Sequence, residues 1–140
     1  MAIDNGLDPS DPLVASALLV KNGDADAAVA GATRPTADVL KAGLQILGVS
    51  PEVEIVSSCF LIVLPNGNQF AYGDCAVIPD PTSEQLASIA ISTALTFEAL
   101  TGEDPRIAKL SFSTHGSANH QRVTKVKNAT DLVRKHDPEL

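Results

Sequence analysis

The stretch Leu110-Ser111-Phe112-Ser113-Thr114-His115-Gly116-Ser117-Ala118-Asn119 decides the expected fold, because it reads as an apolar strand, a loop of small residues and a helix start. The same order occurs earlier, where Ala28-Val29-Ala30-Gly31 precedes Ala32-Thr33-Arg34-Pro35-Thr36. Short apolar runs without charge are typical of central parallel strands that are buried on both faces. The repeated strand–loop–helix order therefore predicts an α/β sheet with both loops at the carboxyl ends of strands, where ligands bind.

The rest of the chain supplies further helices and strands. Asp-Pro pairs at Asp11-Pro12 and Asp80-Pro81 predict helix starts, because Asp can cap the helix and Pro suits its first position. Expected helices cover 11–22, 35–47, 80–102 and 119–136, and expected strands cover 27–31, 53–64, 69–78 and 106–113. We expect a loose lead-in over 1–10 and one α/β domain over 11–140, a layered α/β/α sheet with an antiparallel hairpin.

Spacing and caps predict details of these helices. In the helix over 35–47, the apolar residues expected to face inward are Val39, Leu40, Leu44 and Leu47. Asp80 is expected to cap the third helix, and Ser117 or Asn119 the last one.

Asn66-Gly67 lies between two apolar runs and predicts a hairpin. A two-residue turn would place Cys59 opposite Asp74, whereas a three-residue loop would place Cys59 opposite Cys75. We favour two free thiols and a cytoplasmic location, since two cysteines sixteen positions apart form neither a disulfide framework nor a CxxC metal motif.

Composition excludes several classes of function. The chain has 140 residues and a net charge of −7, which disfavours nucleic-acid binding. No apolar run reaches the roughly 20 residues of a membrane-spanning helix, and the N-terminus does not read as a secretory signal. The three histidines lack metal-ligand spacing, so we expect no metal. Seven of the ten basic residues lie in the last 35 positions, which indicates either a solvated helix face or a local anion site.

Both loops are candidate anion sites. Backbone amides at a helix N-terminus favour phosphate, and hydroxyls add donors. The candidates are Thr33, Arg34 and Thr36 in the first loop and Ser113, Thr114, His115, Gly116 and Ser117 in the second. The alternative is structural, with the hydroxyl residues only capping helices and the glycines only permitting turns. Neither loop has P-loop or GxGxxG spacing, and no complete catalytic constellation is visible.

Several segments together resemble the phosphate acetyl/butyryltransferase family, from about residue 11 to residue 140. They are Gly23-Asp24-Ala25-Asp26, Val29-Ala30-Gly31-Ala32, Thr36-Ala37-Asp38-Val39-Leu40, Asp74-Cys75-Ala76-Val77, Pro79-Asp80-Pro81-Thr82, Glu84-Gln85-Leu86-Ala87 and, most specifically, Leu110-Ser111-Phe112-Ser113-Thr114-His115-Gly116-Ser117. The resemblance implies acyl transfer between acyl-CoA and inorganic phosphate, giving acyl phosphate and CoA. It also implies an isocitrate/isopropylmalate dehydrogenase-like second domain, a homodimer, CoA as a substrate and no tightly bound cofactor.

The resemblance covers only the middle of the family's chain. The family's Ser-Arg-Gly loop and its catalytic Asp are absent, so the catalytic residues of this chain are unknown and its activity alone is uncertain. Binding residues carried over from the family are Thr36, Lys41, Ser113, Thr114, Gly116 and Ser117, and Lys41 stands where the family usually has Arg. Three hypotheses stay open: an incomplete phosphate acyltransferase, a non-catalytic module that binds CoA or acyl phosphate or that dimerises, or a decayed fragment with neither activity nor affinity.

Overall fold

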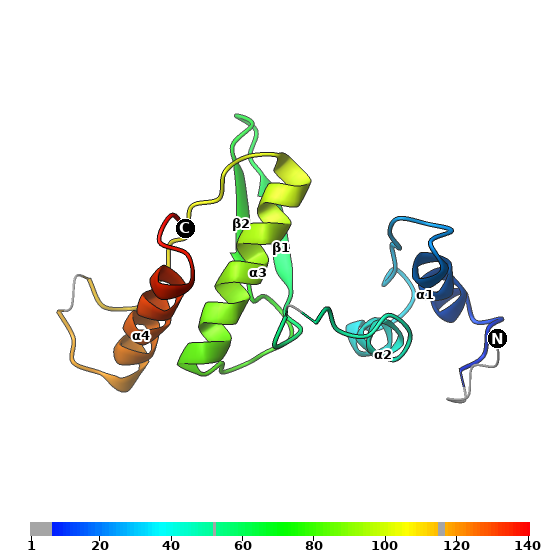
Figure 1. Cartoon of the computed structure of the whole chain (residues 1–140), viewed down its shortest axis with the longest axis horizontal. Helices are drawn as coiled ribbons and strands as arrows, with labels where there is room; N and C mark the ends of the chain where they lie inside the picture. Colours follow the sequence, from blue (N-terminus) through cyan, green and yellow to red (C-terminus); the bar gives the residue numbers. More distant parts are fainter. Residues whose placement is uncertain (1–6, 52, 115–116) are drawn as a thin grey trace. The chain divides into compact units, whose positions relative to one another are not determined.

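The computed structural model describes residues 7–51, 53–114 and 117–140. The chain forms two compact units, Met1–Ser50 and Pro51–Leu140, and each is described by itself (Figure 1). The expectation of one domain over 11–140 therefore stays a prediction.

The first unit is a pair of helices, α1 (Pro12–Asn22) and α2 (Thr36–Ile46). Helix α1 begins as predicted, because Asp11 Oδ1 accepts a hydrogen bond of 2.9 Å from the backbone N–H of Leu13. It ends at Gly23, whose positive φ of 78° suits glycine and whose N–H donates to the last carbonyls of the helix. The small core between the helices consists of Val14, Ala17, Ala42 and Ile46.

Two expectations for this unit are wrong. Leu44 and Leu47 are exposed rather than inward, because α2 packs against α1 through Ala42 and Ile46. The segment 27–31 is not a strand, and Val29 is fully exposed. A parallel strand needs a neighbouring strand to pair its backbone N–H and C=O groups. Among the described residues, no strand pairs with the segment 27–31.

The second unit contains the predicted hairpin, formed by β1 (Cys59–Val63) and β2 (Gln69–Gly73). Its loop has three residues, Pro65 to Gly67, since the N–H of Leu64 donates to Asn68 O over 2.8 Å. Gly67 takes a positive φ of 87°, which is typical of a type I turn followed by a bulge. Cys59 pairs with Gly73, so both registers proposed from the sequence are wrong, and both cysteines are free.

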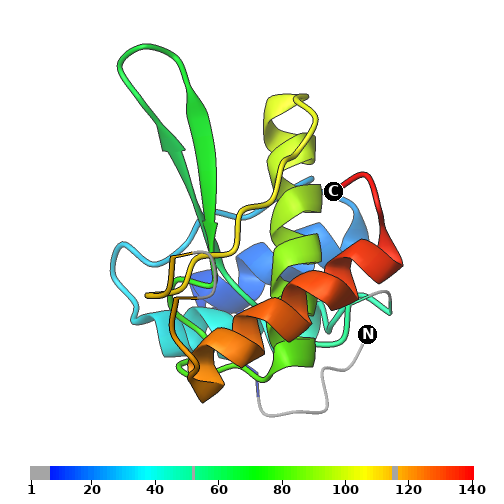
Figure 2. The same ribbon diagram turned by 90° about the vertical axis from the view of Figure 1, so that its left-hand side faces the viewer.

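Helices α3 (Ser83–Thr101) and α4 (Gln121–His136) pack against each other beside the hairpin (Figure 2). Helix α3 is capped by Thr82 and Gln85 in a reciprocal capping box, and not by Asp80. Asp80 instead forms an ion pair with Lys125 of α4. Helix α4 is capped by His120, so the predicted caps Ser117 and Asn119 are also wrong. The buried residues of the two helices are Ala87, Ile89, Ala94, Val123, Ala129 and Val133.

The expected strand over 106–113 is not formed, although the side chains there alternate in exposure as they do in a strand. Exposure alternates from Asp104 to Leu110, with Pro105, Ile107 and Lys109 half-buried and their neighbours exposed. No backbone group of 104–110 has a hydrogen-bond partner among the described residues. The described residues thus form a mixed α/β fold of four helices and a two-stranded antiparallel sheet, in place of the expected layered α/β/α sheet.

Gly73 lets the end of β2 lie directly on α3. A Cβ atom at this position would collide with Thr93 Oγ1 and press on the Thr93 Cβ and Cγ2 atoms at 3.2 and 3.3 Å. The contact between β2 and α3 requires glycine at position 73 because no side chain would fit there. The backbone conformation of Gly73 does not itself demand glycine.

The carboxylate of Asp74 holds the base of the hairpin together. Its Oδ1 accepts hydrogen bonds of 2.6 Å from both the N–H and the hydroxyl of Ser58, and its Oδ2 accepts from the N–H groups of Val77 and Ile78 at 2.9 and 2.7 Å. Burial alone would raise the pKa of Asp74, but the bonds from Ile78, Ser58 and Val77 outweigh it and hold the pKa well below its usual range.

We predict that Gly73→Ala lowers the free energy of unfolding by about 1–3 kcal/mol, because the added methyl group overpacks the contact with Thr93. Chemical denaturation measures the loss. Adding Thr93→Ala should recover part of it. Equal stability of Gly73→Ala and wild type would contradict the contact.

We predict that Asp74→Asn lowers the free energy of unfolding by about 1–2 kcal/mol at pH 7, since an amide cannot accept all four bonds. The pKa of Asp74 is lower in the folded chain, so the difference between the two proteins should shrink as the pH falls below about 4. Urea titrations across this pH range measure it. Asp131→Asn on the exposed side of α4 is the control, and a pH-independent difference would contradict the prediction.

Candidate functional site

The first candidate loop ends at the start of α2. Thr33 and Thr36 are both exposed, and neither caps the helix: the residue before α2 is Pro35, which offers no side-chain hydrogen bond. The structure therefore does not use these hydroxyls as caps. Uncapped amides at a helix start carry partial positive charge and favour an anion.

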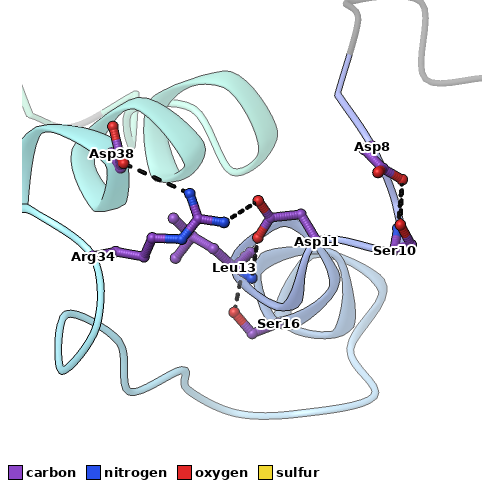
Figure 3. A network of polar contacts seen from close by, with 7 residues as sticks. All are labelled: Asp8, Ser10, Asp11, Leu13, Ser16, Arg34 and Asp38. Carbon is purple, nitrogen blue, oxygen red and sulfur yellow. Dashed lines mark hydrogen bonds and ion pairs between the residues drawn. The ribbon is translucent and has the colours of Figure 1, made fainter.

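Arg34 contacts two carboxylates (Figure 3). Its guanidinium donates to Asp11 Oδ2 over 2.6 Å, and its second nitrogen lies 3.8 Å from Asp38 Oδ2. Asp11 at the same time caps α1, so Arg34 joins the first turn of α1 to the first turn of α2. The guanidinium expected to bind a phosphate is thus occupied by carboxylates in this structure. Lys41 is exposed on α2 and forms no ion pair with a described residue.

The second candidate loop brings two serines together. Ser113 Oγ lies 3.4 Å from Ser117 Oγ and accepts a hydrogen bond of 3.0 Å from the backbone N–H of Ala118. The N–H of Ser117 donates to Thr114 O over 3.0 Å. Two adjacent hydroxyls can donate to the oxygens of one phosphoryl group. His115 and Gly116 lie outside the described residues.

His120 has a role that sequence reasoning missed. Its Nδ1 accepts a hydrogen bond of 3.1 Å from the backbone N–H of Arg122 and so caps α4. The imidazole also packs edge-on against Phe112, with ring centroids 5.3 Å apart. These contacts connect the end of the 106–112 segment to the start of α4. Histidine is not among the preferred caps, so the sequence offers no clear signal for this role.

The two loops belong to different units. The structure brings together Ser113 and Ser117 in one unit, and it brings Arg34 to Asp11 and Asp38 in the other. That both loops bind the same anion stays a prediction. Among the described residues there is no cluster of three or more His, Cys, Asp or Glu side chains suited to a metal. No described helix is long and apolar enough to cross a membrane.

Comparison with known proteins gives consistent matches. The family model for phosphate acetyl/butaryl transferase matches residues 7–140. The chain is 44% identical over 135 residues to the phosphate acetyltransferase of Clostridium acetobutylicum, covering 93% of this chain and 40% of that protein. The phosphate acetyltransferase of Corynebacterium glutamicum is 46% identical over 123 residues, covering 88% of this chain and 37% of its own length.

Solved structures agree. The EutD phosphotransacetylase from Staphylococcus aureus matches with a TM-score of 0.79 and 38% identity, over 91% of this chain and 38% of that one. A phosphotransacetylase from Streptococcus pyogenes gives the same TM-score and identity, over 39% of its chain. This chain spans about two fifths of the length of these relatives. The chain belongs to the phosphate acetyl/butaryl transferase family.

Proposed function

We propose that this chain supplies part of the substrate site of a phosphate acyltransferase, which transfers an acyl group between CoA and inorganic phosphate. The observation that carries the proposal is the family match over residues 7–140, which includes both candidate loops. The substrates are acyl-CoA with phosphate in one direction, and acyl phosphate with CoA in the other. The two free cysteines fit a cytoplasmic location, which we propose as well.

In this proposal the second loop binds phosphoryl oxygens. The hydroxyls of Ser113 and Ser117 lie 3.4 Å apart, so both can donate to oxygens of one phosphoryl group. Gly116, Thr114 and His115 belong to the same loop and are further candidates. Such hydrogen bonds contribute by positioning phosphate and by stabilising the charge that develops during transfer, without a covalent intermediate.

The first loop supplies the other candidate ligands, Thr33, Arg34, Thr36 and Lys41. The amides at the start of α2 and the exposed ammonium of Lys41 suit an anion. Arg34 binds an oxyanion only by giving up a contact with Asp11 or Asp38. We therefore assign Arg34 the smaller share of anion binding and the larger share in holding the loop to α1.

Among the described residues, no carboxylate forms a hydrogen bond with the hydroxyl of Ser113 or Ser117. The resemblance implies that the family's base, an Asp, and its Ser-Arg-Gly loop lie outside the matched residues 7–140. We accordingly expect activity only when the rest of a phosphate acyltransferase is present.

A chimera tests this function. In the Clostridium acetobutylicum enzyme, the aligned segment is replaced by residues 7–140 of this chain, and exchange between acetyl-CoA and phosphate is measured. We expect turnover by the chimera and none by the 140-residue chain alone. A folded chimera without turnover would contradict the proposed function.

In the active chimera, Ser113→Ala should lower kcat/KM for phosphate by about 10- to 100-fold, since a hydrogen bond to a charged group contributes roughly 1.5–3 kcal/mol. Thr124→Ala is the control. The hydroxyl of Thr124 is exposed on α4 and donates to the carbonyl of His120, the residue that caps the same helix. If both substitutions have the same effect, Ser113 does not bind phosphate.

A non-catalytic module that binds CoA or acyl phosphate is the second candidate, favoured by the adjacent hydroxyls of Ser113 and Ser117, which can hold phosphoryl oxygens without any catalytic step. Calorimetry of the 140-residue chain with acetyl-CoA and with acetyl phosphate separates the two functions. Binding to the chain together with an inactive chimera would favour the module.

We also propose a homodimer. The hairpin presents an exposed apolar face made by two cross-strand pairs, Phe60 with Tyr72 and Ile62 with Phe70, which are 39–59% exposed. Such a face favours association. Sedimentation should give a dimer, and Phe60→Lys with Phe70→Lys should give a monomer. An unchanged dimer in this variant would place the interface elsewhere.

A further inference from the structure

Lys109 is a half-buried lysine that the proposed function does not use. It lies on the segment 104–110, which runs alongside α3 in Figure 2. Its side chain lines two hollows of the second unit: an apolar groove of about 610 Å³ between β2, α3 and this segment, and a cavity of about 70 Å³ beside α4. Four other lysines of the chain are exposed and serve as a comparison: Lys21, Lys41, Lys127 and Lys135.

The surroundings of Lys109 offer its ammonium group little polar compensation. Its Nζ donates to Leu86 O over 2.9 Å, and among the described residues no carboxylate forms an ion pair with it. The residues with ionisable groups that line the same two hollows are Tyr72 of β2, Glu103, Asp104 and Arg106 of the adjoining chain, Arg134 of α4 and the carboxyl-terminal residue Leu140. Burial therefore acts without a paired negative charge and lowers the pKa of Lys109 to about 8.

This position makes Lys109 a better nucleophile at neutral pH than an exposed lysine. Only the uncharged amine carries the lone pair that attacks an acyl carbon. At pH 7 a pKa of about 8 leaves about one amine in eleven uncharged, against roughly one in three thousand at the usual value of 10.5. The lower basicity weakens the attack by about 10- to 20-fold, taking the dependence measured for thiolates. A net advantage of about 15- to 30-fold remains.

An acyl phosphate can supply the acyl group. In such a reaction Nζ forms a bond to the acyl carbon, the bond from that carbon to the phosphate oxygen breaks, and inorganic phosphate leaves with the electron pair. The amine proton passes to the solvent, so no further reactant is needed. The groove beside Lys109 has room for a molecule as small as acetyl phosphate, whereas the much larger CoA group makes acetyl-CoA a poorer fit.

We propose that Lys109 is a self-acylation site, whose amine takes the acyl group from an acyl phosphate. For the identity of the donor the inference rests on the proposed function, because acyl phosphate is a product or a substrate of that reaction. The modified side chain suits its place. The amide of an acetylated lysine is uncharged, so its burial costs less than that of the ammonium, and its N–H can still donate to Leu86 O. Acylation thus removes one positive charge and keeps the contact between 104–110 and α3.

Incubation of the 140-residue chain with acetyl phosphate at pH 7 tests the inference, and peptide mass spectrometry measures the acetylation of each lysine. We expect Lys109 to be acetylated at least about tenfold faster than the mean of the four exposed lysines. In urea this preference should vanish, because burial is lost with the fold. A rate at Lys109 no higher than that mean, or a preference that persists in urea, overturns the inference. Faster acetylation of Lys109 by acetyl-CoA at equal concentration overturns the proposed donor.

The pH profile of acetylation distinguishes a lowered pKa from a difference in accessibility. The rate at Lys109 should rise by about tenfold per pH unit below pH 8 and level off above it, since the amine is then largely uncharged. The rates at the exposed lysines should keep rising to about pH 10. A parallel rise at Lys109 and at the exposed lysines up to about pH 10 would overturn the inference.

A matched pair of variants locates the modification. Lys109→Met removes the amine and keeps an unbranched apolar side chain, and Lys127→Met makes the same change at an exposed position of α4. Intact-mass spectrometry should show that the fast single acetylation is lost in Lys109→Met and kept in Lys127→Met, and circular dichroism should show that both variants keep their helices. Fast acetylation that survives in Lys109→Met overturns the inference.

The outcome is separable from that of the proposed function, because acetyl phosphate is added from outside and no turnover is required. An acetylated Lys109 together with an inactive chimera would overturn the proposed function alone. An active chimera together with an unreactive Lys109 would overturn this inference alone.

Discussion

An extended backbone needs partners for its N–H and C=O groups, and this requirement governs the second unit. Helices α3 and α4 satisfy their backbone groups internally, and β1 and β2 satisfy one edge of each other. The chain over 104–110 has neither arrangement, although it is extended and rests one face on α3. This unit is therefore a layer of helices with part of a sheet, and its open edges lie on both sides of an apolar groove.

Features set by neighbours in the sequence could be predicted well. The Asp11 cap and the hairpin follow from local chemistry, and the structure confirms both. Helix α1 ends at Gly23 and helix α3 at Gly102, and both glycines take a positive φ, as is common at helix ends. Where two local signals compete, the one that forms more hydrogen bonds decides the structure. Asp80 precedes helix α3, but the helix is capped by Thr82 and Gln85, which form a reciprocal capping box. In the hairpin, Pro65 joins Asn66-Gly67 to make a three-residue loop, which moves the register by one position.

Features that depend on distant residues were not predictable in the same way. Arg34 was expected to bind an anion, but Asp11, 23 residues earlier, takes its guanidinium. The strands over 27–31 and 106–113 have the apolar pattern of buried strands, yet a strand forms only beside a partner. For the candidate site, the spacing of Ser113 and Ser117 does place both hydroxyls together. Whether the first loop binds the same anion depends on the arrangement of two units, which local sequence patterns do not encode.

We propose that this chain supplies part of the phosphate site of a phosphate acyltransferase, with Ser113 and Ser117 as donors to the phosphoryl oxygens. Exchange between acetyl-CoA and phosphate by the chimera with the Clostridium acetobutylicum enzyme is the decisive measurement. We expect turnover by the folded chimera. A folded chimera without turnover would show that these residues do not serve this reaction.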